Sequence, residues 1–166
     1  MKKLIIVNGT MGVGKSAVCS LLNKKLENSV WLDGDWCWMM NPFIPNEENR
    51  AMVEDNINHL LRNFLNNPSF EYVIFNWVIH SEDIFEMILN KLSDLEFEVS
   101  KITLMCSEES LKRRILKDIA DNLRDEGCIE RSIERLPLYE NMDTIKIDTS
   151  NISVKETVKK IIEIVK

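Results

Sequence analysis

Residues 4–22 of this 166-residue chain read LIIVNGTMGVGKSAVCSLL, and this stretch decides the fold. The apolar run at 4–7 is followed by the octapeptide GTMGVGKS at 9–16, which fits the phosphate-binding pattern G-x-x-x-x-G-K-[ST]. A helical pattern follows at once in residues 17–22. Strand, glycine-rich loop and helix in this order are the context that such a motif requires. We therefore expect the chain to bind a nucleoside triphosphate.

The residue types in this loop suit the binding of phosphate. Glycines allow backbone conformations that a side chain forbids, so consecutive N–H groups can point toward one anion, and the helix that follows adds its positive dipole end. Lys15 would be the cation for the β- and γ-phosphates, and the hydroxyl of Ser16 is a hard oxygen ligand for Mg²⁺. The expected nucleotide-binding residues of the loop are Gly9, Thr10, Met11, Gly12, Val13, Gly14, Lys15, Ser16 and Ala17.

Length and composition bound the kind of protein. We expect residues 1–166 to form a single domain with a sizeable core. The net charge of −6 argues against a dedicated binder of nucleic acid or of anionic membranes. No apolar run approaches the roughly 20 residues of a membrane span, and the first one is too short for a signal peptide. Four cysteines without C-x-x-C spacing are typical of reduced thiols, so we expect a cytoplasmic protein.

Apolar runs alternate along the chain with helical patterns. Short runs without polar interruption are typical of strands buried on both faces, and strands that alternate with helices predict a parallel sheet covered on both faces. We expect a three-layer α/β fold with five parallel strands. The strand-like runs are 4–7, 30–32, 72–77, 99–105 and 144–147, and the helical patterns include 53–64, 84–92 and 154–165. The expected N-caps are Asn46, Ser81, Ser107 and, with Glu156 in a capping box, Ser153.

Two carboxylates follow the second predicted strand in Asp33-Gly34-Asp35. Ligands of such sheets bind at the carboxyl ends of the strands, where an aspartate can hold Mg²⁺ or accept the proton of an attacking hydroxyl. An Asp-Gly pair is also common in plain turns. We expect both acids to be catalytic and favour Asp35 as the base, because it lies further out on the loop. Asp33 and Ser16 would then bind the metal, and the reverse assignment of the two acids stays open.

Aromatic and thioether side chains crowd residues 36–43, which read WCWMMNPF. Such a segment either lines an apolar pocket for the phosphoryl acceptor or forms the packed start of a helix. We favour the pocket for Trp36. The expected substrate-binding residues are Asp35, Trp36 and Trp77.

The third predicted strand ends in Asn76, and no acid follows before Glu82. Many P-loop proteins carry a metal-binding aspartate at this place. Its absence speaks against a motor-type or AAA-type ATPase.

Arginines gather in residues 113–135, which we expect to form a helical lid. Phosphoryl transfer needs cations over the transferring group, and a helix–loop–helix that closes over the nucleotide supplies them. We assign this catalytic role to Arg114 and Arg131, with Arg114 also binding the nucleotide. The secondary candidates are Arg113, Arg124 and Arg135.

With these residues placed, the chain resembles the small P-loop kinases. Asp33-Gly34-Asp35 resembles an element of adenylylsulfate and gluconate kinases, and residues 5–9, 103–109, 111–114 and 129–136 resemble tunicamycin-resistance ATP-binding proteins and chloramphenicol-phosphotransferase-like proteins. The resemblance implies ATP and Mg²⁺ as cofactors. It also implies acids that bind Mg²⁺ and orient or deprotonate the acceptor hydroxyl, with Arg114 and Arg131 as lid arginines. One departure is Asp118, where these proteins often carry an arginine.

We therefore expect an ATP-dependent phosphotransferase that moves the γ-phosphoryl group to a hydroxyl of a small molecule. A nucleoside or nucleotide, a sugar or an antibiotic are the acceptor classes that stay open, as does the oligomeric state. One alternative is a non-catalytic or slowly hydrolysing ATP-binding protein that sequesters a drug or signals. A nucleic-acid 5′-end kinase is a further alternative, which the net charge of −6 does not favour.

Overall fold

The computed structural model describes residues 1–125 and 127–166, and a five-stranded parallel sheet forms its centre. The strands lie in the order β2-β3-β1-β4-β5, with every neighbouring pair parallel. This confirms the five parallel strands predicted from the alternating pattern. The strands are β1 (Lys2–Asn8), β2 (Ser29–Asp33), β3 (Tyr72–Asn76), β4 (Phe97–Met105) and β5 (Ile145–Asp148).

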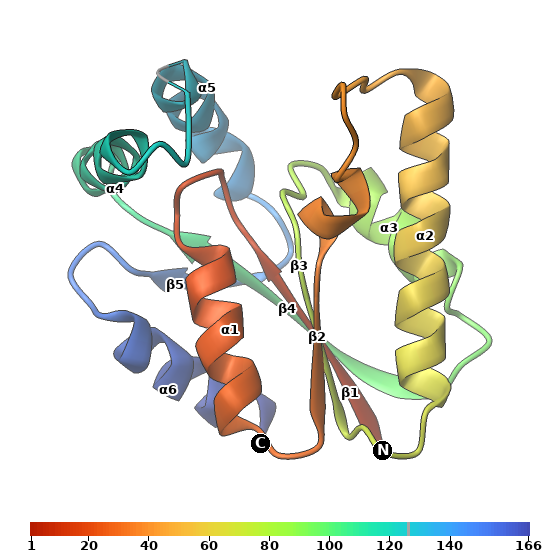
Figure 1. The fold of residues 1–166 in the computed structure, drawn as a ribbon. Helices are drawn as coiled ribbons and strands as arrows, with labels where there is room; N and C mark the ends of the chain where they lie inside the picture. Colours follow the sequence, from red (N-terminus) through yellow and green to blue (C-terminus); the bar gives the residue numbers. More distant parts are fainter. Residues whose placement is uncertain (126) are drawn as a thin grey trace.

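Helices cover both faces of the sheet, as predicted. Figure 1 shows α1 and α6 together on one side of the sheet and α2 and α3 on the other. Among the described residues, no helix has both the length and the apolar character needed to cross a membrane. The α-helices are α1 (Lys15–Lys25), α2 (Glu47–Asn66), α3 (Glu82–Asn90), α4 (Glu108–Ala120), α5 (Cys128–Arg135) and α6 (Val154–Val165), and the two 3₁₀ helices are η1 (Gly34–Trp38) and η2 (Leu136–Tyr139).

The central strand β1 explains why its sequence is apolar at consecutive positions. Ile5 and Val7 face the core that α1, α4 and α6 close, whereas Leu4 and Ile6 face the core that α2 and α3 close. All four side chains are fully buried. A strand that is covered on both faces carries no polar alternation, which is why the run at 4–7 reads as it does.

Helix starts follow the predicted caps with one exception. The side chains of Asn46 and Ser107 accept hydrogen bonds from backbone N–H groups in the first turns of α2 and α4. Ser153 and Glu156 form the predicted capping box of α6. Ser81 holds the N-cap position of α3 without a side-chain hydrogen bond.

The turn from β1 into α1 depends on glycine. Gly9, Gly12 and Gly14 have φ angles of 143°, 82° and 106°, which L side chains rarely adopt. Gly9 carries a further restriction, because a Cβ atom there would lie 2.7 Å from the carbonyl oxygen of Leu104 in β4. Around Gly14 no atom lies within 4 Å of such a Cβ. The loop is therefore held against the sheet at its start and is open to solvent where α1 begins.

These two glycines form a matched pair for a stability test. Gly14→Ala should cost about 1–2 kcal/mol, which is the backbone strain alone. Gly9→Ala should cost about 1–3 kcal/mol more, because the added methyl also meets a backbone atom that cannot move aside. Urea unfolding without nucleotide measures both free energies, and equal losses at the two positions would contradict the contact with Leu104.

Candidate active site

A cavity of about 660 Å³ opens beside the β1–α1 loop. The loop and the first turn of α1 contribute Met11 to Val18, α4 contributes Arg114, and the start of α6 contributes Ser153, Val154 and Thr157. Asp35 and Val78, which follow β2 and β3, complete the side nearest the strand ends. The fold thus brings the predicted phosphate loop, one of the two acids and one of the two lid arginines to a single cavity, at the strand ends where ligands of open α/β sheets bind.

Lys15 is buried at the base of this cavity. Its Nζ atom donates hydrogen bonds to the carbonyl oxygens of Gly9 and Thr10, at 2.8 and 2.9 Å. Burial lowers the pKa of Lys15 to about 8, and the carboxylates of Asp35 and Asp33 act against that decrease. The ammonium group is held within the phosphate loop, where a triphosphate would supply the negative charge that it lacks.

Ser16 and Asp33 meet at the end of β2. The hydroxyl of Ser16 donates to Oδ2 of Asp33 at 2.6 Å, and the other carboxylate oxygen accepts from the backbone N–H of Asp35 at 3.0 Å. Asp33 is buried. The pair places a hydroxyl and a carboxylate in contact, which are the two oxygen types expected to hold Mg²⁺.

Asp35 lies two residues after Asp33, in the first turn of η1, and is exposed at the edge of the cavity. Loss of hydration and the neighbouring carboxylate of Asp33 raise the pKa of Asp35, while the cations Lys15 and Arg124 oppose the rise. A carboxylate with a raised pKa and an open side is suited to accept a proton. The two acids therefore differ in environment: one is bound on both oxygens, and the other faces the cavity.

Arg114 joins α4 to the loop before α6. Its guanidinium group donates to the carbonyl oxygen of Val13 and to Oγ1 of Thr149, both at 3.0 Å, and to the carbonyl oxygen of Thr149. These contacts fix the side chain at the wall of the cavity. Thr149 itself is buried and lies in the turn between β5 and α6, for which the sequence left open a contact with the nucleotide or a plain entry into the helix.

The structure does not bring Arg131 to the cavity. Its guanidinium pairs with the carboxylate of Asp125 at 3.0 Å, and both side chains are more than half exposed. Arg124 does line the cavity, held by Asp118 at 2.8 Å. From the sequence, Arg124 was a weaker candidate than Arg131, because a sequence does not show in which direction each arginine side chain points.

The aromatic residues near Asp35 are packed against the protein. The ring of Trp36 lies 4.8 Å from that of Trp31, although half of Trp36 stays exposed. Trp77 covers Gly34 so closely that a Cβ atom there would come within 2.6 Å of its ring. Neither tryptophan lines the cavity of the phosphate loop. Residues 34–38 form η1, and Trp38 packs against the core that α2 closes. This agrees with the second interpretation of residues 36–43, in which they form the packed start of a helix.

Asn76 takes the place at the end of β3 where an acid is often found. It is buried, pairs in register with Asp33 of β2, and accepts a hydrogen bond of 2.6 Å from Nε1 of Trp31. The side chain of Trp31 thus fixes the amide group. Among the described residues, no three His, Cys, Asp or Glu side chains gather into a metal cluster.

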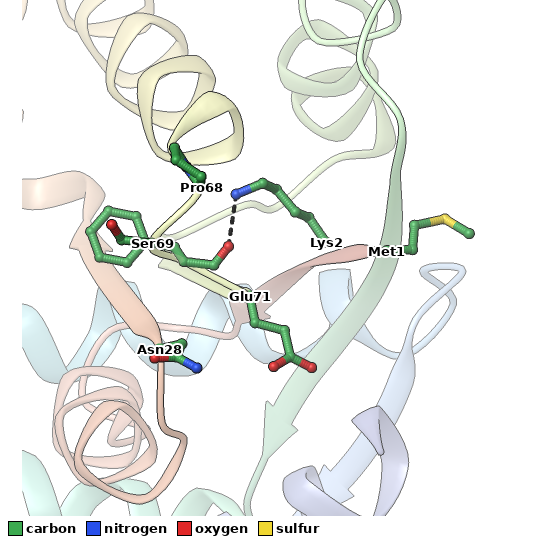
Figure 2. A pocket seen from close by; sticks show the side chains of 7 residues that line it. Met1, Lys2, Asn28, Pro68, Ser69 and Glu71 are labelled. Carbon is green, nitrogen blue, oxygen red and sulfur yellow. Dashed lines mark hydrogen bonds between the residues drawn. The ribbon is translucent and has the colours of Figure 1, made fainter.

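A second pocket, of about 500 Å³, lies at the opposite end of the sheet. Figure 2 shows Lys2 reaching across it, where its Nζ atom donates to the carbonyl oxygen of Phe70 at 2.7 Å. Glu71 contributes the carboxylate of this pocket. The ammonium group of Lys2 is bound to main-chain oxygens at the amino ends of the strands, so this pocket lacks the convergent groups of the first cavity.

A comparison with known protein families identifies the family of this chain. Residues 5–135 match the family described as AAA domain. The chain belongs to this family. The sequence favoured neither a motor-type nor an AAA-type ATPase, because no acid directly follows the third strand. The match places the chain in a family that carries the AAA name, and the structure has an amide, that of Asn76, at the end of β3.

A curated relative is the cytidylate kinase of Buchnera aphidicola, which is 31% identical over 85 residues. That match covers 51% of this chain and 36% of the relative, so the chain spans about a third of the relative's length.

Solved structures with the same fold include several kinases. The tunicamycin resistance protein of Deinococcus radiodurans matches 99% of this chain and 96% of its own, with a TM-score of 0.73 and 18% identity. A gluconokinase from Sinorhizobium meliloti matches 95% and 88% of the two chains, with a TM-score of 0.68 and 17% identity. The APS kinase of Mycobacterium tuberculosis matches 98% and 96%, with a TM-score of 0.67 and 16% identity. The predicted resemblance to these groups is confirmed in the fold.

The buried ammonium group of Lys15 gives a test of the site. Lys15→Met should raise the free energy of unfolding at pH 7 by about 1–3 kcal/mol, because a lysine with a lowered pKa makes the folded state bind its proton less tightly than the unfolded state. The same variant should lose measurable ATP binding.

The pH dependence has a defined sign. The free energy of unfolding of the wild type should rise between pH 8 and pH 10.5, because over this range the folded protein has already released the Lys15 proton and the unfolded chain still binds it. The difference in stability between Lys15→Met and the wild type should therefore shrink over that range. Urea unfolding at pH 7 and pH 10 measures the difference. If Lys15→Met were less stable than the wild type at pH 7, the buried ammonium group of Lys15 would not destabilise the folded state, and the prediction would be wrong.

Proposed function

We propose that this protein is an ATP-dependent phosphotransferase that moves the γ-phosphoryl group to a hydroxyl of a small molecule. The observation that carries the proposal is the contact of Ser16 with Asp33 at 2.6 Å, with Asp35 at the edge of the same cavity as Lys15. A protein that only holds ATP has no need of a second, outward-facing carboxylate. The fold shared with a gluconokinase and an APS kinase supports the same reaction class.

The residues present fit ATP and Mg²⁺. The glycines at 9, 12 and 14 give the loop a backbone that can turn its N–H groups toward phosphate, and Lys15 adds a positive charge. Ser16 and Asp33 offer hard oxygen ligands on one side, as suits an ion that keeps several waters and binds one or two protein groups. Bound Mg²⁺ would neutralise negative charge on the β- and γ-phosphates.

The residues of the chain then divide the work. Lys15 and the loop amides bind and orient the triphosphate, and Arg114 closes one wall of the site from α4. Asp35 accepts the proton of the acceptor hydroxyl, because its carboxylate is open to the cavity and its raised pKa brings it closer to neutral pH. Asp33 is bound to Ser16 and to the Asp35 amide, so it holds the metal side instead.

Asp35→Asn separates binding from transfer. The variant should bind ATP with nearly unchanged affinity and lose about 100-fold or more in turnover, since only the proton acceptor is gone. Wild-type turnover should rise with pH through the raised pKa of Asp35, because the carboxylate must be ionised to accept a proton, and the variant should lack that rise.

Asp33→Asn is the matched control for the role of each acid. It should weaken the Mg²⁺ dependence of ATP binding, which titration calorimetry with and without Mg²⁺ measures. If Asp33→Asn leaves ATP affinity intact and abolishes transfer while Asp35→Asn does not, the two roles are exchanged.

The acceptor is found by measuring ADP release from ATP·Mg²⁺ against a panel of hydroxyl compounds. Nucleosides, nucleotides, sugars, shikimate, aminoglycosides, phenicols and tunicamycin-like uridines cover the classes that the fold relatives suggest. Stimulation by one compound identifies the substrate class. Tight ATP binding without stimulation by any compound would overturn the proposal in favour of a protein that sequesters a drug or signals, a reading that Asn76 in place of an acid favours.

A further inference from the structure

The chain reverses sharply after α4, and this reversal points Arg124 into the cavity. Asn122 adopts a left-handed conformation with φ 56°, which asparagine tolerates better than most residues. The backbone N–H groups of Asn122 and Leu123 donate to the carbonyl oxygens of Ile119 and Asp118, at 2.9 and 2.8 Å. The turn thus directs the chain at Arg124 back along α4.

The folded-back arginine is held by one carboxylate. Nε of Arg124 lies 2.8 Å from Oδ2 of Asp118, and each side chain is only about one third exposed, at 31% and 32%. Another ion pair of α4, between Lys112 and Glu108, has side chains that are 48% and 56% exposed. The Asp118–Arg124 pair is therefore the more sheltered one, and both of its members line the cavity of the phosphate loop.

The charge of Arg124 reaches the centre of the proposed site. Arg124 lines the same cavity as Lys15 of the phosphate loop and Asp35, the proposed proton acceptor. An isolated carboxylate at Asp118 would repel a triphosphate. Paired with Arg124, it instead turns a long and mobile cation toward the place where phosphate is expected.

We propose that Arg124 contacts the terminal phosphates of the bound nucleotide and that Asp118 is the residue that positions it. This rests on the proposed function only in that the ligand is a nucleoside triphosphate. Arg131, which pairs with the exposed Asp125, does not share this task. The lid thus contributes a cation from the turn between its helices, and the acid on α4 sets where that cation lies.

The test measures the dissociation constants of ATP, ADP and AMP with Mg²⁺ by titration calorimetry. Arg124→Met should weaken ATP about tenfold or more and AMP less than about threefold, because the lost contact is to the terminal phosphates. Arg124→Lys should recover part of the loss. Lys112→Met, which removes a cation of α4 outside the cavity, is the matched control and should leave all three constants unchanged.

Asp118→Asn distinguishes a residue that positions Arg124 from one that only supports the end of α4, because the expected change in ATP affinity has opposite signs with and without Arg124. With Arg124 present it should weaken ATP about threefold or more, because the cation loses its anchor. In the Arg124→Met background it should tighten ATP, because an unpaired carboxylate leaves the cavity. Thermal unfolding of each variant checks that α4 is intact.

Three results would overturn the proposal. They are unchanged ATP binding in Arg124→Met, an equal loss for AMP and ATP, and an equal weakening by Asp118→Asn in both backgrounds, which is what mere damage to the end of α4 would give. Nucleotide affinity needs no acceptor, so a failure to find an acceptor would reject the phosphotransferase while leaving this affinity pattern to be decided separately.

Discussion

The site depends on keeping one ammonium group, that of Lys15, buried at the start of a helix. A buried cation is costly unless polar groups surround it, and here two carbonyl oxygens of the loop bind it while two carboxylates lie nearby. The loop can present those carbonyls because Gly9 and its fellow glycines accept φ angles that other residues avoid. The burial of the Lys15 ammonium group remains unfavourable, as its lowered pKa indicates, and the negative charge of a triphosphate would offset that cost.

The order of the strands determines which acid stands beside this lysine. β3 lies between β1 and β2, so Asn76 sits between the phosphate loop and Asp33. An amide at that point adds no third negative charge to the two carboxylates. Trp31 binds the amide oxygen, and the acid that contacts Ser16 comes from the next strand out. Asp33 and Asp35, the proposed metal ligand and the proposed proton acceptor, are consequently two residues apart on one short segment, so their different environments follow from local geometry.

Helices α4 and α5 are hydrogen-bonded to the phosphate loop. Thr10 donates to the carbonyl oxygen of Ser132 in α5, at 2.8 Å, and Arg114 of α4 donates to the carbonyl oxygen of Val13. Both helices of the predicted lid are thus anchored near their middles to the phosphate loop. Between these two helices, Leu123 and Arg124 line the cavity, and Arg124 is bound to Asp118.

The sequence by itself determined the sheet, the phosphate loop and the acids after β2. These features depend on local patterns: an apolar run buried on both faces, glycines spaced for an anion, and two acids directly after a strand. The capping box of Ser153 and Glu156 was predictable for the same reason, since both partners lie within one turn.

Only the tertiary structure decided which side chains converge. Arg131 and Arg124 are equally basic in the sequence, yet one pairs with Asp125 at the surface and the other with Asp118 in the cavity. Trp36 and Trp77 pack on Trp31 and Gly34 because η1 and the end of β3 happen to meet there. Direction in space depends on how loops reverse and which elements they touch, and those contacts join residues too far apart for a sequence pattern to record.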